Sequence, residues 1–173
     1  MTSSHSAKQS SLPLAGLASD GWTKEKEATA TCFCGGVQMV FPTEKPGLVD
    51  TFVCNCTDCR KITASMFASN FIAKDEFISF VRGENQLKQF AQSKTIESGN
   101  TMTNHFCGNC GTLMFRVSSG APDAKIMRIG TIDDFALQET KLKPRIEQYT
   151  KDRSNWCAGA RSAEQHEGAF YKL

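Results

Sequence analysis

Seven of the eight cysteines fall into three tight groups, and their spacing constrains the fold more than any other feature of the chain. Cysteines one or two residues apart are too close to staple a fold by disulfides, but as thiolates they are good neighbouring ligands for one metal ion. The groups are Cys32-x-Cys34, Cys54-x-Cys56-x-x-Cys59 and Cys107-x-x-Cys110. We therefore predict a fold organised around metal-bound cysteines.

The cysteines are expected to be reduced. The Ser-rich segment 1–21 has one apolar run, LPLAGLA, with no basic region close before it beyond Lys8, which argues against a secretory signal. In a reducing compartment, clustered cysteines bind metal more often than they form disulfides. We expect a cytoplasmic protein that holds zinc, because the Cys-x-x-Cys spacing is typical of that metal.

Charge and hydropathy argue against two classes of partner. Lys and Arg number 20 against 18 Asp and Glu, and the resulting net charge of +2 provides no basic field for nucleic acid. No stretch approaches the roughly 20 apolar residues that span a bilayer. We therefore expect no nucleic-acid partner and no membrane partner.

The chain is predicted to be mostly β. Short runs rich in β-branched and aromatic residues alternate with Gly, Pro, Asn and Asp, which favours strands. Strands are expected at 30–41, 48–56, 66–73, 77–83, 87–93, 103–110, 112–117 and 125–132, with short helical turns at 57–65 and 132–137. Its 173 residues suit one domain, at 28–157, with a disordered or weakly ordered leader at 1–27 and a C-terminal tail at 158–173.

The segment FCGNCGT, which contains Cys107 and Cys110, has the shape of a zinc knuckle. Glycine after each cysteine lets the backbone turn tightly and aim amides at the sulfurs. A knuckle supplies two ligands, and residues i and i+2 of a strand face the same side, so Cys32 and Cys34 are the expected partners. We call these residues the four-cysteine set and expect it to hold a structural zinc ion that contributes to the folding free energy.

Cys54, Cys56 and Cys59, which we call the cysteine triplet, are the candidate catalytic residues. A catalytic zinc ion typically has three protein ligands and an open fourth position. Three thiolates leave the ion with a net charge of about −1, so an entering thiol would lose its proton and stay nucleophilic. Arg60 and Lys61 follow directly, and we predict that these cations bind a thiol substrate that carries carboxylates.

Other ligand allocations remain open. The triplet is a second structural site if His105 or Cys157 closes it. Alternatively, it contributes two ligands to the knuckle, which would leave Cys32 and Cys34 as buried thiols.

The segments CFCGG, CNCTDCRK and HFCGNCGT, in this order, resemble the glutathione-dependent formaldehyde-activating enzyme family, which also includes centromere protein V. IGTIDD at 129–134 and KPRIEQYTKDRSNW at 143–156 are similar to later family segments. The resemblance covers about residues 28–157. It implies twisted antiparallel sheets of short strands, shared with a Rab-associated zinc-binding protein. It also implies that the four-cysteine set is structural and the triplet reactive.

The activity implied by this resemblance is that of a zinc-dependent carbon–sulfur lyase. The enzyme would bind glutathione or a similar thiol at the open position of a second zinc ion, which is either permanently bound or labile, and add it to formaldehyde or another small electrophile. With formaldehyde the product is S-hydroxymethylglutathione. Asp133 and Asp134 are candidates for holding the glutathione amine, although paired carboxylates at a strand end more often cap turns. The alternative is a non-catalytic, zinc-stapled protein-interaction module, which the triplet argues against because one closed site suffices for stability.

Two positions depart from the family pattern. Ala64 stands where many members have glycine, so its methyl group is expected to narrow the approach to the metal or to alter a turn. The stretch Arg145-Ile146-Glu147 stands where many members have a histidine pair or His-Ile after the proline. Both changes leave the cysteines intact and are expected to affect the choice of substrate.

Overall fold

The computed structural model describes residues 12 and 16–171. The fold is mostly β, as the sequence predicted. The greater part of the predicted leader, residues 1–11 and 13–15, lies outside the described residues. The implied likeness to a Rab-associated zinc-binding protein stays a prediction.

Two short helices accompany the strands in the described part, α1 (Thr57–Thr63) and α2 (Phe135–Glu139). Short 3-10 turns link several of the other elements. The strands are β1 (Glu27–Thr31), β2 (Gln38–Pro42), β3 (Leu48–Cys54), β4 (Ala68–Lys74), β5 (Ser79–Arg82), β6 (Leu87–Gln92), β7 (Met102–Cys107), β8 (Leu113–Ser118), β9 (Ala121–Arg128), β10 (Ile146–Gln148) and β11 (Glu164–Gln165).

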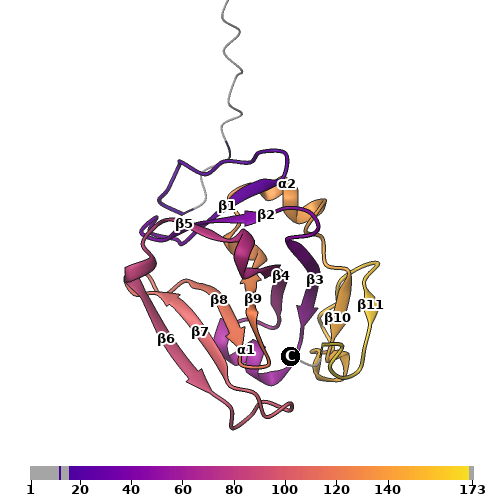
Figure 1. The fold of residues 1–173 in the computed structure, drawn as a ribbon. Helices are drawn as coiled ribbons and strands as arrows, with labels where there is room; N and C mark the ends of the chain where they lie inside the picture. The colour runs from indigo at the N-terminus through magenta and orange to yellow at the C-terminus, as the bar shows by residue number, and fades with distance from the viewer. Residues whose placement is uncertain (1–11, 13–15, 172–173) are drawn as a thin grey trace, which may run out of the picture.

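The strands form a small sheet and a large sheet. The small sheet has the order β1-β2-β5, and the eight-stranded sheet has the order β11-β10-β3-β4-β9-β8-β7-β6. Figure 1 shows the small sheet across one end of the large sheet and α1 towards the other end. Pairing is antiparallel except at β10, which runs parallel to both β3 and β11. The large sheet is therefore mixed, because a C-terminal segment adds to its edge.

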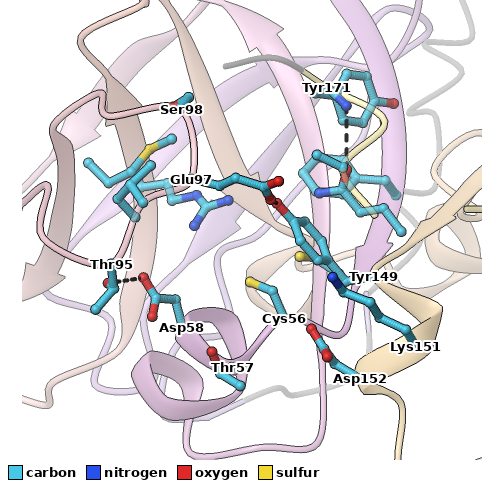
Figure 2. A pocket seen from close by; sticks show the side chains of 17 residues that line it. Cys56, Thr57, Asp58, Thr95, Glu97, Ser98, Tyr149, Lys151, Asp152 and Tyr171 are labelled. Atoms are coloured by element: carbon cyan, nitrogen blue, oxygen red, sulfur yellow. Dashed lines mark hydrogen bonds between the residues drawn. The ribbon is translucent and has the colours of Figure 1, made fainter. Parts of the chain in front are cut away.

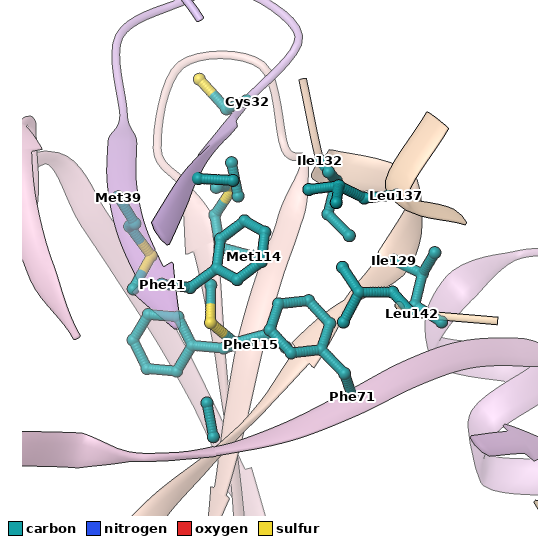
Figure 3. Close-up of a cluster of buried hydrophobic side chains, with 14 of the residues drawn as sticks. Cys32, Met39, Phe41, Phe71, Met114, Phe115, Ile129, Ile132, Leu137 and Leu142 are labelled. Atoms are coloured by element: carbon teal, nitrogen blue, oxygen red, sulfur yellow. The ribbon is translucent and has the colours of Figure 1, made fainter. Parts of the chain in front are cut away.

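The main hydrophobic core lies between the two sheets (Figure 3). Met39 and Phe41 of β2 meet Phe71, Phe115 and Met127 of the large sheet, and all five side chains are buried. The rings of Phe41 and Phe71 have centroids 4.8 Å apart. Burial of large apolar side chains, at about 1.5–3 kcal/mol each, stabilises the packing of one sheet on the other.

The opposite face of the large sheet carries a second buried cluster. Side chains alternate along β3, so Phe52 and Cys54 point to this second face, where they join Ile72 and Ile126. Tyr171 covers Phe52, with ring centroids 4.9 Å apart. The sheet thus separates the apolar core on one side from the cysteine triplet on the other.

Two segments differ from the expected elements. The sequence predicted one strand at 30–41, but β1 and β2 form an antiparallel hairpin. Cys32 and Cys34 lie in its turn, where Gly35 has a positive φ of 79°. The turn therefore brings the two cysteines together, and the alternation of side chains along a strand does not. Residues beyond 157 also join the sheet through β11. The predicted domain boundary at 157 stays a prediction.

Ala64 lies at the C-terminal end of α1 in the left-handed conformation, with φ 50° and ψ 35°. It is exposed and lies away from the lining of the pockets described below. Of the two expected effects of its methyl group, the structure favours the altered turn.

Replacing Ala64 with glycine is expected to stabilise the protein by about 0.5–1 kcal/mol, because the left-handed conformation costs a residue with a Cβ atom free energy that glycine does not lose. Urea denaturation measures the change. Thr63→Gly is the control: it removes a helical residue whose hydroxyl donates to the carbonyl of Cys59, so it should destabilise. A loss of stability in Ala64→Gly would contradict the prediction.

Candidate metal centres and the adjoining pocket

The four-cysteine set is assembled as the sequence predicted. The four Sγ atoms lie within 4.8 Å of one another. The Sγ of Cys34 is 3.6 Å from that of Cys32 and 3.7 Å from that of Cys107. Four thiolates at about 2.3 Å around a tetrahedral ion would be about 3.8 Å apart, which is close to the two separations of Cys34.

Local hydrogen bonds hold the sulfurs of this set in place. The amide of Val37 donates to the Sγ of Cys32 at 3.2 Å. The hydroxyl of Thr112 lies 3.2 Å from the Sγ of Cys110 and accepts from the amide of Phe33 at 3.1 Å. Thr112 therefore links the knuckle to the hairpin turn. The four sulfurs supply all four ligands that a closed tetrahedral site requires.

The cysteine triplet forms a separate group at the junction of β3 and α1. Cys54 ends the strand, Cys56 is the N-cap of the helix, and Cys59 lies in its first turn. The Sγ of Cys56 accepts from the amide of Cys59 at 3.4 Å, as the oxygen of an ordinary N-cap residue would. The three Sγ atoms lie within 4.8 Å of one another. The triplet therefore offers three ligands to one ion.

Neither alternative fourth ligand belongs to this group among the residues that the structure describes. His105 stacks on Phe115, with ring centroids 4.2 Å apart, on the core side of the sheet. Cys157 lines a different pocket, together with Val53 and Asn55. Since Val53 alternates with Cys54 along β3, that pocket lies on the other face of the strand.

The thiols of the triplet compete for ionisation. Hydrogen bonds with Cys54 and Cys56 lower the pKa of Cys59, whereas hydrogen bonds with Cys56 and Cys59, and then burial, raise the pKa of Cys54. One thiolate is thus favoured at the expense of another. All three ionise together only when a cation offsets their repulsion, which is the condition that a bound metal ion provides.

A pocket of about 660 Å³ opens beside the triplet (Figure 2). In this view Cys56 lies between Asp58 and Tyr149. The pocket is of a size that suits small-molecule ligands. Its lining residues are Phe52, Cys54, Cys56, Thr57, Asp58, Thr95, Ile96, Glu97, Ser98, Met102, Arg116, Gln148, Tyr149, Lys151, Asp152, Ala169 and Tyr171.

The segment between β6 and β7 forms one wall of this pocket. The hydroxyl of Thr95 donates to Asp58, and the hydroxyl of Tyr149 donates to Glu97 at 2.8 Å. Tyr149 has a positive φ of 56°, which is uncommon for a bulky residue. Burial and the contact with Glu97 raise the pKa of Tyr149, so its hydroxyl keeps its proton and remains a donor.

Two buried arginines behind the triplet were missed by the sequence reading. Arg116 of β8 is 9% exposed and Arg128 of β9 is 6% exposed. Burial alone would lower the pKa of Arg116, but Cys59 and its two partner sulfurs raise it. A signal existed for Arg116, which interrupts an otherwise apolar run in β8, whereas Arg128 ends a strand that also carries Asp123 and Lys125. The sequence did not show that both strands bring their arginines to the face that carries the triplet.

The predicted substrate cations lie away from the pocket lining. Arg60 donates to the backbone carbonyl of Asp152 at 3.0 Å, and Lys61 is exposed. The positive side chains that line the pocket are Arg116 and Lys151. A substrate-binding role for Arg60 and Lys61 stays a prediction, and the geometry favours the other two cations.

The paired aspartates have structural contacts. The buried carboxylate of Asp133 accepts from the hydroxyl of Thr31 at 2.7 Å. Asp134 is the N-cap of α2 and accepts from the amide of Ala136 at 3.0 Å. Neither lines the pocket beside the triplet. These contacts favour the capping interpretation.

Glu147 supports the triplet from the opposite side of β3. Its carboxylate is fully buried and accepts from Asn55 Nδ2 at 2.9 Å and Arg153 Nη1 at 3.0 Å on one oxygen. The other oxygen accepts from the amide of Ala160 at 2.7 Å and from Gln165 Nε2 at 2.9 Å. Because Asn55 lies between two of the triplet cysteines, Glu147 fixes the backbone that carries them.

Replacing Glu147 with glutamine is expected to lower the free energy of unfolding by about 2–4 kcal/mol at pH 7. One carboxylate oxygen, which accepts two hydrogen bonds, becomes an amide nitrogen that cannot accept them. Burial raises the pKa of Glu147, but its donors lower it below the ordinary 4.5. The carboxylate's contribution is therefore present above about pH 4.5 and lost as the pH falls through the folded pKa.

Urea denaturation of both proteins between pH 7 and pH 3 tests this expectation. The difference in unfolding free energy between the wild type and Glu147→Gln should become smaller below about pH 4.5. Glu164→Gln is the matched control, since Glu164 is exposed and pairs with Arg145 at the surface. A pH-independent difference for Glu147→Gln would contradict the prediction.

Residues 27–152 match the family model described as glutathione-dependent formaldehyde-activating enzyme. No curated protein matches the chain. Among solved structures, it is similar to a Rhodobacter sphaeroides protein, with 19% identity over 60% of this chain and 85% of that chain and a TM-score of 0.44. Within the described residues, every helix is too short or too polar to cross a membrane.

Proposed function

We propose, from the premise that this chain belongs to the glutathione-dependent formaldehyde-activating enzyme family, that it is a carbon–sulfur lyase-type enzyme. It joins the thiol of glutathione to formaldehyde or another small electrophile, and the formaldehyde product is S-hydroxymethylglutathione. The observation that carries the proposal is a group of three cysteine sulfurs, without a fourth ligand among the described residues, beside a pocket of about 660 Å³.

The proposed cofactor is zinc at both cysteine groups. The four-cysteine set would hold a structural ion and the triplet a catalytic one, since all-sulfur ligands at these distances suit zinc. When bound to the triplet, zinc supplies the positive charge that keeps an entering thiol ionised at neutral pH. The eight cysteines are free, which suits a reducing, cytoplasmic location.

The charges that line the pocket suit a zwitterionic tripeptide. Lys151 offers a cation for a carboxylate of glutathione, whereas Glu97 and Asp152 offer carboxylates for its ammonium group. Tyr149 donates to Glu97 and would hold that carboxylate towards the ligand. These residues bind and orient glutathione so that its sulfur meets the electrophile beside the triplet.

The proposal is tested by binding and turnover. Glutathione added to cobalt-substituted protein should shift the thiolate-to-cobalt absorption bands, and formaldehyde consumption should accelerate only when glutathione and enzyme are both present. If no thiol alters the spectrum and formaldehyde loss is not accelerated, a non-catalytic zinc module is the better description. A spectral response without formaldehyde turnover would keep the thiol site and exclude formaldehyde as the substrate.

A further inference from the structure

A row of buried polar side chains crosses the sheet face that carries the triplet. Asn104 of β7 lies opposite Arg116 of β8, and Asn70 of β4 lies opposite Arg128 of β9. All four are less than a tenth exposed. Burial of two guanidinium groups is costly unless partners compensate, so their surroundings indicate what they bind.

The two arginines differ in their partners and in their access to the pocket. Arg128 donates to the side-chain oxygen of Asn70 and does not line the pocket. Arg116 lines the pocket and interacts electrostatically with Cys59. Its Nε has no hydrogen-bond partner within the described part of the chain, and the same holds for Nε and Nη2 of Arg128. Arg116 is therefore the guanidinium that a ligand in the pocket can approach.

The charges leave one cation in excess. Three thiolates around a divalent ion carry about −1, which one guanidinium would neutralise. The chain places two there, and both act on Cys59. The face beside the triplet thus keeps about one positive charge after metal binding, and the entering thiolate offsets it. The guanidinium of Arg116 still lines the pocket, where it can donate to an oxyanion formed beside that sulfur.

We propose that Arg116 is a catalytic residue that stabilises the alkoxide formed when a thiolate adds to an aldehyde. This inference rests on the proposed function. The thiolate sulfur donates an electron pair to the carbonyl carbon and forms the carbon–sulfur bond. The carbonyl π pair moves to oxygen, to which the guanidinium donates, and water then protonates the oxygen. The proton that the thiol released to solvent balances this step.

The first test uses kinetics of zinc-loaded protein. Removal of one donor to a developing oxyanion typically lowers kcat by about 100- to 1,000-fold. Arg116→Met is expected to show this loss, with a KM for glutathione within about three-fold of wild type. Arg116→Lys keeps the charge but not the forked donor, so its kcat is expected to fall at least ten-fold. Arg161→Met is the control, since Arg161 is exposed and lines neither pocket, and it should retain kcat within about three-fold.

The second test needs no turnover. S-(carboxymethyl)glutathione places a carboxylate where the alkoxide would form, and S-(carbamoylmethyl)glutathione is its neutral match. Calorimetry should give tighter binding of the carboxylate form by about ten-fold in wild type and in Arg161→Met, and no preference in Arg116→Met. Zinc content of each variant is measured alongside.

The outcomes separate the two claims. If Arg116→Met weakens both analogues equally, Arg116 binds the tripeptide itself, and the inference is wrong while the proposed function stands. If wild type binds neither analogue and does not respond to glutathione, the proposed function fails. Should Arg116→Met not fold, Arg116→Lys decides, because an unchanged kcat in that variant would overturn the alkoxide role.

Discussion

Replacing Cys56 with serine is expected to abolish turnover and to lower the zinc content from about two ions to about one per chain, because two remaining thiolates hold zinc poorly. Cys56 is the best position for this test, since it lines the pocket and is the least buried of the triplet. The unfolding free energy should change by less than about 2 kcal/mol. Activity assays, metal analysis and urea denaturation measure the three quantities.

Cys157→Ser is the matched control for this prediction. Cys157 is also partly exposed but belongs to neither cysteine group. Its substitution should leave both the zinc content and the activity unchanged. A Cys56→Ser protein that keeps both zinc ions and full activity would remove the triplet from the mechanism.

Replacing Cys110 with serine is expected to unfold the protein, whereas Cys56→Ser is expected to leave the fold intact. A structural zinc site in small peptides contributes about 10–16 kcal/mol, whereas a whole domain has about 5–15 kcal/mol of net stability. The four-cysteine set joins the β1–β2 hairpin to the end of β7, two segments far apart in sequence. Without its metal, these segments lose their link and little stability remains.

Circular dichroism and thermal denaturation check this expectation, again with Cys157→Ser as the control. A chelator strong enough to strip both ions from wild-type protein should reproduce the Cys110→Ser result, whereas a weak chelator that removes only the triplet's ion should reproduce the Cys56→Ser result. A Cys110→Ser protein with wild-type melting behaviour would show that the fold does not depend on this cluster.

The cysteine groups were predictable because ligand spacing is a local property of the sequence. Short separations restrict which sulfurs can meet, and the structure assembles the predicted four and the predicted three. The mostly β character was also predictable, since strand propensity and turn residues are local. Roles for the individual residues of the triplet remain predictions.

The features that were missed depend on long-range register. β10 has three residues, so it shows no alternation that would identify a strand, and its parallel pairing with β3 joins segments about 90 residues apart. Arg60 and Lys61 were chosen because they neighbour the triplet in sequence, but α1 directs Arg60 to the carbonyl of Asp152. Arg116 reaches the site only through strand pairing in the large sheet.

The pocket is lined partly by residues that lie outside the family match. The triplet and most of its surroundings lie within the family match at 27–152, whereas Ala169 and Tyr171 lie beyond it and still line the pocket. Tyr171 also covers Phe52, which lies two residues before Cys54 of the triplet. Under the proposed function, substitutions in the segment that carries these two residues are expected to change which electrophiles enter the pocket without altering the cysteines.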